Sequence, residues 1–139
     1  MALIPLFLVS GLLHAYVGWR IGPALGVFGG AFWGAEVALW LLLAVSTALV
    51  PMGLVARRFA KPPASDVLTW LGLLFMGLMS SLLVLTVLRD VLLLAAGALA
   101  LVWPQEFVAD GLTLWSAVAV PLLGLGVTAL GYWNARRTA

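Results

Sequence analysis

The 139-residue chain contains no cysteine, one histidine and five carboxylates. The lack of cysteine excludes disulfides, thiolate metal sites and cysteine nucleophiles. The sequence also lacks a glycine-rich phosphate loop and a paired-histidine metal motif, and it offers no serine–histidine–aspartate set with a plausible base in a water-accessible fold. Its net charge of +2 is too small to indicate a nucleic-acid partner. We therefore expect no catalytic residue, no metal ligand and no bound cofactor within this chain.

Charge of either sign is scarce, and the remaining residues are mostly apolar. Charged residues make up 9% of the chain and hydrophobic residues 65%, with a mean hydropathy of +1.20. A soluble domain is about 25% charged. Because about 20 apolar residues form one membrane-spanning helix, this length allows about four spans. The sequence predicts an all-α integral membrane protein, a four-helix transmembrane bundle in one domain over residues 1–139. Its expected spans are residues 3–19, 35–56, 67–90 and 112–132.

The third span has two possible continuations. Its apolar run is interrupted by Arg89 and Asp90, and residues 91–103 are apolar again. A single helix over residues 67–103 would be about 55 Å long, which exceeds a hydrocarbon core of about 30 Å. The sequence predicts either an extended third helix or an added helical segment over residues 91–103 that bends back. That segment is too short to form a span of its own.

The distribution of basic residues predicts the orientation. With four spans, the N-terminus, the loop after the second span and the C-terminal end lie on one side. Five of the seven basic residues share that side, namely Arg57, Arg58, Lys61, Arg136 and Arg137. The positive-inside rule places this side in the cytoplasm. We expect a multi-pass protein of a bacterial inner membrane, with both termini cytoplasmic.

Five ionisable residues within or beside the spans are candidate functional residues, because such groups are costly in a bilayer. They are His14, Arg20, Glu36, Arg89 and Asp90. His14 has no second ligand at a suitable spacing, so we favour a neutral imidazole hydrogen-bonded to a neighbouring helix over a metal ligand. Glu36 begins a span, where a carboxylate favourably meets the helix dipole. Proton coupling by Glu36 is the alternative.

Arg89 and Asp90 are adjacent, so their side chains are not expected to face each other on a helix. Each then needs another partner or water. The interpretation that we favour places both at the outer membrane interface. The alternative is a buried polar contact with Glu36 or His14.

Glycines recur every four residues from the end of the first span onward, at Gly18, Gly22, Gly26, Gly30 and Gly34. Small residues at this spacing allow two helices to pack closely. Glycine is also entropically costly in a helix, and Pro23 lies within the series. We favour a flexible connector, and a helix-packing face remains the alternative.

Three segments together resemble the N-terminal transmembrane region of bacterial membrane-bound metallophosphoesterases of the calcineurin-like superfamily. The first is His14-Ala15-Tyr16 followed by Arg20. The second is PMGLVARR over residues 51–58. The third is LTWLGLLF over residues 68–75, followed by a leucine-rich run that ends in RDVL at residues 89–92. The resemblance covers about residues 14–137 and lies in the order of the segments.

The resemblance implies a function that this chain does not itself perform. In that family a soluble hydrolase domain follows the last membrane helix. There two metal ions, held by Asp, His and Asn residues, activate a water that attacks a phosphate ester. The D-x-H, G-D and G-N-H motifs of that domain are absent here. The resemblance therefore implies a membrane anchor, with the phosphoesterase domain beginning near residues 134–139.

Two other function classes remain open. The chain could be a small non-enzymatic membrane subunit of a larger complex, using the glycine series and residues 91–103 as contact faces. It could also be a minimal proton-coupled transporter that uses Glu36 or His14. In all three cases the chain is embedded in the lipid bilayer, which is its main partner.

Overall fold

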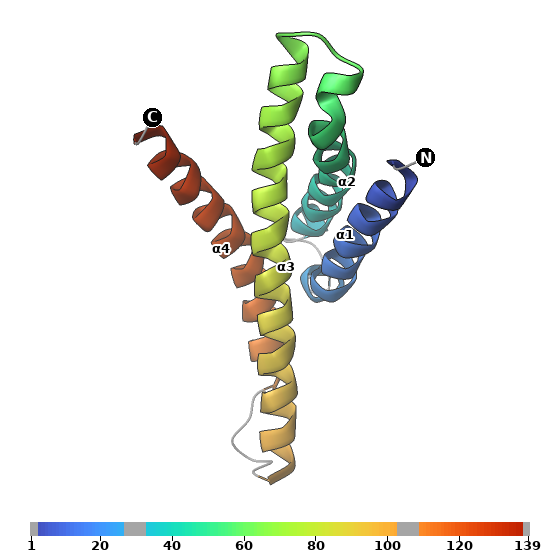
Figure 1. Cartoon of the computed structure of the whole chain (residues 1–139). Helices are drawn as coiled ribbons and strands as arrows, with labels where there is room; N and C mark the ends of the chain where they lie inside the picture. Colours follow the sequence, from blue (N-terminus) through green and yellow to red (C-terminus); the bar gives the residue numbers. More distant parts are fainter. Residues whose placement is uncertain (1–2, 27–32, 103–108, 138–139) are drawn as a thin grey trace.

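The computed structural model describes residues 3–26, 33–102 and 109–137, and within these ranges it contains helices and no strand. The elements are α1 (Leu3–Gly26), α2 (Trp33–Val55), the short 3₁₀ helix η1 (Ala56–Arg58), α3 (Ala64–Val102) and α4 (Ala109–Arg137), as Figure 1 shows. All four α-helices are long and apolar enough to cross a membrane. The predicted all-α membrane fold is confirmed.

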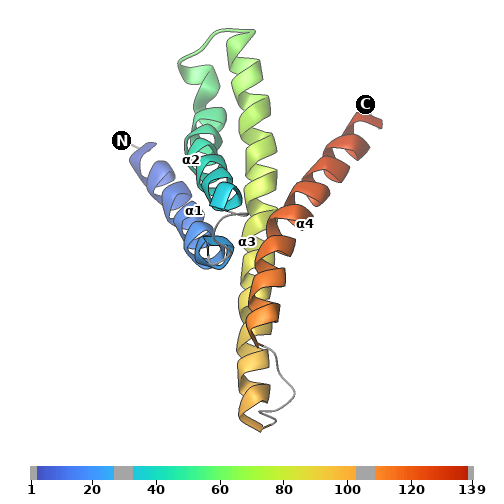
Figure 2. The ribbon, with the colours of Figure 1, turned by 180° about the vertical axis from the view of Figure 1, so that it is seen from behind.

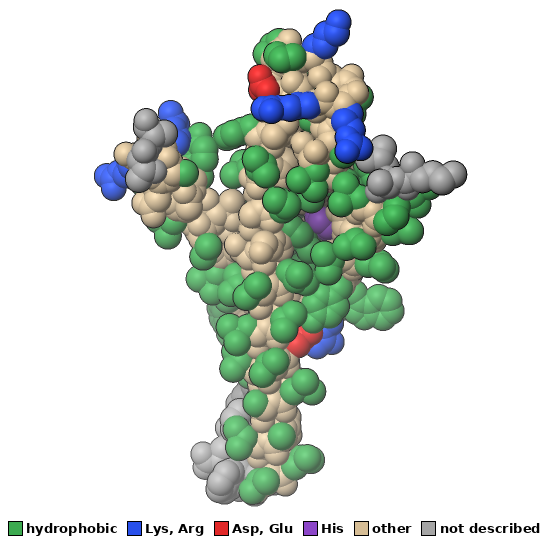
Figure 3. Space-filling model, viewed as in Figure 1, with side chains coloured by type: hydrophobic (Ala, Val, Ile, Leu, Met, Phe, Trp, Pro, Cys, Tyr) green, Lys and Arg blue, Asp and Glu red, His purple; other side chains and the backbone are tan. Residues whose placement is uncertain are grey.

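The composition of these helices suits a lipid environment. A bilayer offers no water to backbone N–H and C=O groups, so a spanning segment must satisfy them internally, as a helix does. The few hydroxyl groups follow the same rule, because several bond to a carbonyl one turn earlier in their own helix. These are Thr47, Thr69, Ser81, Thr86 and Thr128. Hydrophobic side chains cover the outer faces (Figure 3), as contact with lipid tails requires.

α3 is the axis of the molecule, and α1, α2 and α4 all pack against it. Its 39 residues extend about 58 Å at 1.5 Å per residue. The last part of α3 continues beyond α1 and α2, where only the first part of α4 accompanies it (Figures 1 and 2). The extended third helix is therefore the correct alternative. The bend after Asp90 is wrong for residues 91–102, and residue 103 lies outside the described residues.

The first helix is longer than predicted. The expected span ended at residue 19, but α1 continues to Gly26 and includes Pro23. This proline has no N–H group to bond to the carbonyl oxygen of Trp19, and α1 continues for only three residues beyond it. The flexible connector is therefore wrong for residues 18–26. Gly30 lies outside the described residues. The fourth helix also extends beyond the predicted residues 112–132 at both ends.

α2 and α3 form a tight antiparallel hairpin. Gly53 of α2 and Gly72 of α3 face each other, and a Cβ atom on either would lie 2.6 Å from the Cα atom of the other. The two backbones are thus in direct contact, which only glycine permits. The hairpin turn, the N-terminal end of α1 and the C-terminal end of α4 lie at the same end of the molecule (Figure 1).

The core lies where the four helices approach one another along the middle of α3. Its central residues are Val17, Ile21, Leu39, Leu43, Leu82, Ala117 and Val120. In the described part of the chain, the backbones of α2 and α4 do not come within 8 Å of each other at any pair of Cα atoms. α4 instead diverges from α3 toward the C-terminus (Figure 2). The fold thus consists of α1, α2 and α3 packed together, with α4 on the other side of α3 and diverging from it.

Candidate functional site

Asp90 is the centre of a polar cluster between α1 and α3. Its Oδ1 atom accepts a hydrogen bond from Arg20 Nη2 at 2.7 Å, and its Oδ2 atom accepts one from Arg20 Nε at 2.7 Å. The hydroxyl of Tyr16 donates a further bond to Oδ2 at 2.7 Å. Tyr16 and Arg20 share one face of α1, because they are four residues apart. Bidentate hydrogen bonds from arginine to a carboxylate are among the strongest in proteins, so this contact holds α1 to α3.

Arg89 connects the same cluster to α4. Its side chain is 4% exposed, and it donates to Ser116 Oγ at 3.0 Å. It also donates to the backbone oxygen atoms of Arg20 and Thr113, each at 3.1 Å. The guanidinium thus satisfies acceptors on α1 and α4 at once, and a buried charge requires such partners.

For Arg89 and Asp90, the alternative of a buried contact with Glu36 or His14 is wrong. Neither residue contacts His14 or Glu36 in the described structure, because Asp90 pairs with Arg20 and Tyr16. The expectation that neighbouring side chains stay apart is also wrong, since Arg89 Nη1 lies 3.7 Å from Asp90 Oδ1. Asp90 lies about 39 Å along α3 from Ala64, further than the thickness of a hydrocarbon core of about 30 Å. A helix that enters the membrane at Ala64 therefore carries this cluster to the opposite interface.

His14 makes a second polar contact, between α1 and α2. Its imidazole is 3% exposed. Nδ1 lies 2.6 Å from the backbone oxygen of Ser10, and Nε2 lies 2.7 Å from Ser46 Oγ. A carbonyl oxygen only accepts, so Nδ1 carries the hydrogen and Nε2 of a neutral ring accepts from Ser46. Ser10 Oγ also donates to the backbone oxygen of Thr47 at 3.2 Å. This geometry fits the neutral, hydrogen-bonded imidazole that the sequence favours.

The remaining candidates have different surroundings. Gly18 and Gly22 face the indole of Trp40 on α2, where an added Cβ would lie 2.5 Å and 3.1 Å from ring atoms. Gly26 lies directly against the carboxylate of Glu36, which belongs to the first turn of α2. Gly34 has open space around it. The first three glycines of the series therefore lie on the face of α1 that packs against α2.

Sequence reasoning did not single out Ser46, Ser116, Trp40 or the pair Gly53 and Gly72. A hydroxyl inside an apolar span is a signal for an interhelical hydrogen bond, and it could have identified the two serines. Within the described ranges, no group of three histidine, aspartate or glutamate side chains could hold a metal ion. In the same part of the chain, every buried side-chain nitrogen and oxygen has a hydrogen-bond partner. The clusters therefore join helices together and leave no buried polar atom free for a ligand.

Comparisons of the chain with protein-family models, with curated proteins and with solved structures give no match. The residues and their geometry are thus the basis for the function proposed below.

Proposed function

We propose that this chain is a membrane-anchoring domain that holds a metal-dependent phosphoesterase domain at the bilayer surface. One observation carries the proposal: of the three segments that resemble that family, the first and the second both contact the third. Tyr16 and Arg20 of the first segment bind Asp90 of the third. Gly53 of the second segment faces Gly72 of the third. The resembling residues are thus the ones that hold the helices together, as a shared membrane fold requires.

The anchoring role follows from what the polar groups do. Asp90 pairs with both Arg20 and Arg89, and His14 bonds to Ser46. Such pairings stabilise a membrane fold and supply no reactive group. In the proposal, the catalytic residues and both metal ions belong to the domain that follows α4. Tethering then keeps that domain close to membrane-associated substrates, which raises their effective concentration.

The source gene tests this proposal directly. We expect the reading frame to continue past codon 139 and to encode D-x-H, G-D and G-N-H motifs. The full-length protein should then hydrolyse a phosphate ester only when a divalent metal is present. A stop codon directly after Ala139 would exclude the proposal as stated.

A second candidate is a non-enzymatic subunit of a larger membrane complex. The open angle between α2 and α4 favours it, because these helices leave an apolar hollow of about 530 Å³. Leu39 and Ala35 line it on one side, and Val118 and Leu122 on the other. A helix of another protein could fill this space. Blue-native electrophoresis of native membranes separates the two candidates, since a subunit migrates with its partners and a tethered enzyme carries phosphoesterase activity.

A proton-coupled transporter gains little from the geometry. Both ring nitrogens of His14 are engaged by serine residues, and Glu36 lies against Gly26 at the end of α1. Transport that is abolished by His14→Ala or Glu36→Gln, in a variant that keeps its fold, would restore this possibility.

A further inference from the structure

The basic end of the α2–α3 hairpin contains a hollow with two chemically distinct parts. A cavity of about 400 Å³ lies between the end of α2, η1 and the first turns of α3. Arg57 and Arg58 line its outer part. Leu54 and Leu73, each about half exposed, line the part that faces the membrane interior. The hollow thus offers positive charge beside apolar surface.

The positive charge is largely available. Arg57 lies 3.8 Å from Asp66, but the two side chains are 79% and 59% exposed. An exposed ion pair of this kind contributes little, so an anion can replace Asp66. The side chain of Arg58, at the end of η1, is exposed and forms no hydrogen bond or ion pair with the residues that the structure describes. Basic side chains gather at this end of the molecule (Figure 3), which adds to the local positive potential.

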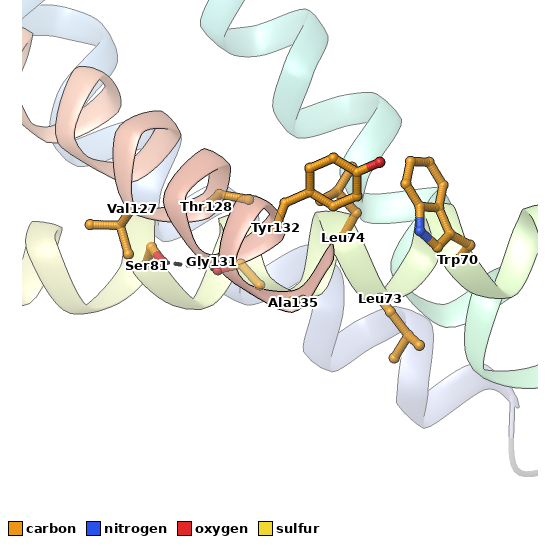
Figure 4. Close-up of a pocket in the computed structure, with 10 residues that line it drawn as sticks. Trp70, Leu73, Leu74, Ser81, Val127, Thr128, Gly131, Tyr132 and Ala135 are labelled. Atoms are coloured by element: carbon orange, nitrogen blue, oxygen red, sulfur yellow. Dashed lines mark hydrogen bonds between the residues drawn. The ribbon is translucent and has the colours of Figure 1, made fainter. Parts of the chain in front are cut away.

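The apolar part continues toward the membrane interior. Leu73 also lines a groove of about 380 Å³ between α3 and α4 (Figure 4). This groove begins beside Trp70 and Tyr132, whose rings meet edge to face at 5.8 Å, and reaches Ser81 and Val127. Along α3 it extends about 16 Å from Trp70 to Ser81 at 1.5 Å per residue. Leu73 is therefore shared by the basic hollow and a long apolar groove.

We propose that this combined surface is a binding site for an anionic phospholipid. The phosphate lies between Arg57 and Arg58, whose guanidinium groups match phosphate oxygens in geometry and charge. An acyl chain passes over Leu73 into the groove between α3 and α4. Basic hollows between membrane helices recognise lipid headgroups in this way. A soluble phosphate would use the arginines alone and leave the adjoining apolar groove empty, so the lipid accounts for both parts.

Native mass spectrometry of the purified protein in detergent micelles tests the site. The probes are phosphatidylglycerol and phosphatidylcholine with identical acyl chains, added in equal amounts. We expect phosphatidylglycerol to be retained preferentially. The double variant Arg57→Gln/Arg58→Gln should weaken its binding about 25-fold, because each arginine near an anionic headgroup contributes about fivefold. Leu73→Ala should weaken lipid binding severalfold while leaving both arginines in place.

The matched control is Lys61→Gln/Arg137→Gln, which removes the same charge from this end without touching the lining of either hollow. It should retain phosphatidylglycerol as the unmodified protein does. Three outcomes would overturn the proposal: equal retention of the two lipids, an equal loss in the control variant, or displacement of the lipid by equimolar glycerol 3-phosphate. The last outcome would indicate a site for free phosphate. All five substituted side chains are exposed, and a thermal unfolding curve verifies that each variant is folded.

Discussion

Gly53 and Gly72 bring the backbones of α2 and α3 into contact, since a Cβ atom on either glycine would lie 2.6 Å from the Cα atom of the other. Asp90 lies about 27 Å further along α3, where Arg20 binds it. The long central helix is thus held at two separate points by two different kinds of contact. The first depends on the absence of a side chain and the second on a charged hydrogen bond.

Gly72→Ala should destabilise the hairpin by about 1–3 kcal/mol, because a methyl group overpacks a contact between rigid backbones. Titration of dodecyl sulfate into mixed micelles measures this free energy of unfolding. Gly77→Ala is the matched control on the same helix, because no neighbouring atom lies within 4 Å of its added Cβ. We expect the control to be neutral or slightly stabilising. Equal stabilities of the two variants would contradict the direct backbone contact.

Arg20 and Asp90 should show strong energetic coupling. A double-mutant cycle with Arg20→Met and Asp90→Ala isolates their interaction, for which we expect about 1.5–3 kcal/mol, the range for hydrogen bonds to charged groups. The exposed pair Arg57 and Asp66, at 3.8 Å, provides the comparison and should couple by less than about 1 kcal/mol. A weaker coupling for Arg20 and Asp90 than for the exposed pair would refute the role of the cluster in holding α1.

Ser46→Ala should lower the free energy of unfolding by about 0.6–1.7 kcal/mol, the range for hydrogen bonds between membrane helices. The substitution leaves Nε2 of the buried His14 without its partner on α2. Ser81→Ala is the control, because that hydroxyl is exposed and bonds only to Gly77 O of its own helix, at 3.0 Å. An unchanged stability of Ser46→Ala, measured in the same micelles, would show that the His14 contact does not hold the helices.

The lack of cysteine makes the chain a ready background for mapping its orientation. Lys61→Cys should react with a membrane-impermeant maleimide only in inverted vesicles, because the proposed orientation places the hairpin turn in the cytoplasm. Leu101→Cys, at the far end of α3, should react in intact spheroplasts if α3 projects beyond the lipid. The unmodified protein serves as the unlabelled control. The reverse labelling pattern would invert the orientation.

Much of the architecture is present in the local sequence. Apolar runs of this length, with so few charges, have no alternative to spanning helices, because lipid leaves backbone groups no other hydrogen-bond partners. The number of helices and the position of α2 follow from this. The position at which α1 ends does not follow from the sequence, because the glycines and Pro23 predict a connector there. Packing of Gly18 and Gly22 against Trp40 stabilises the helix beyond that point.

The partners of the polar residues were decided by the tertiary structure. Asp90 and Arg20 are 70 residues apart in the chain. Helices surrounded by lipid are apolar on both their packed and their exposed faces, so the sequence carries no amphipathic pattern that reveals which face meets which neighbour. For the same reason the sequence does not show whether residues 91–102 continue α3 or bend back. In the structure they continue α3, and the first part of α4 packs alongside them (Figure 2). Hydropathy thus determines that the chain enters the membrane as helices, whereas shape and hydrogen bonding between distant residues determine how those helices meet.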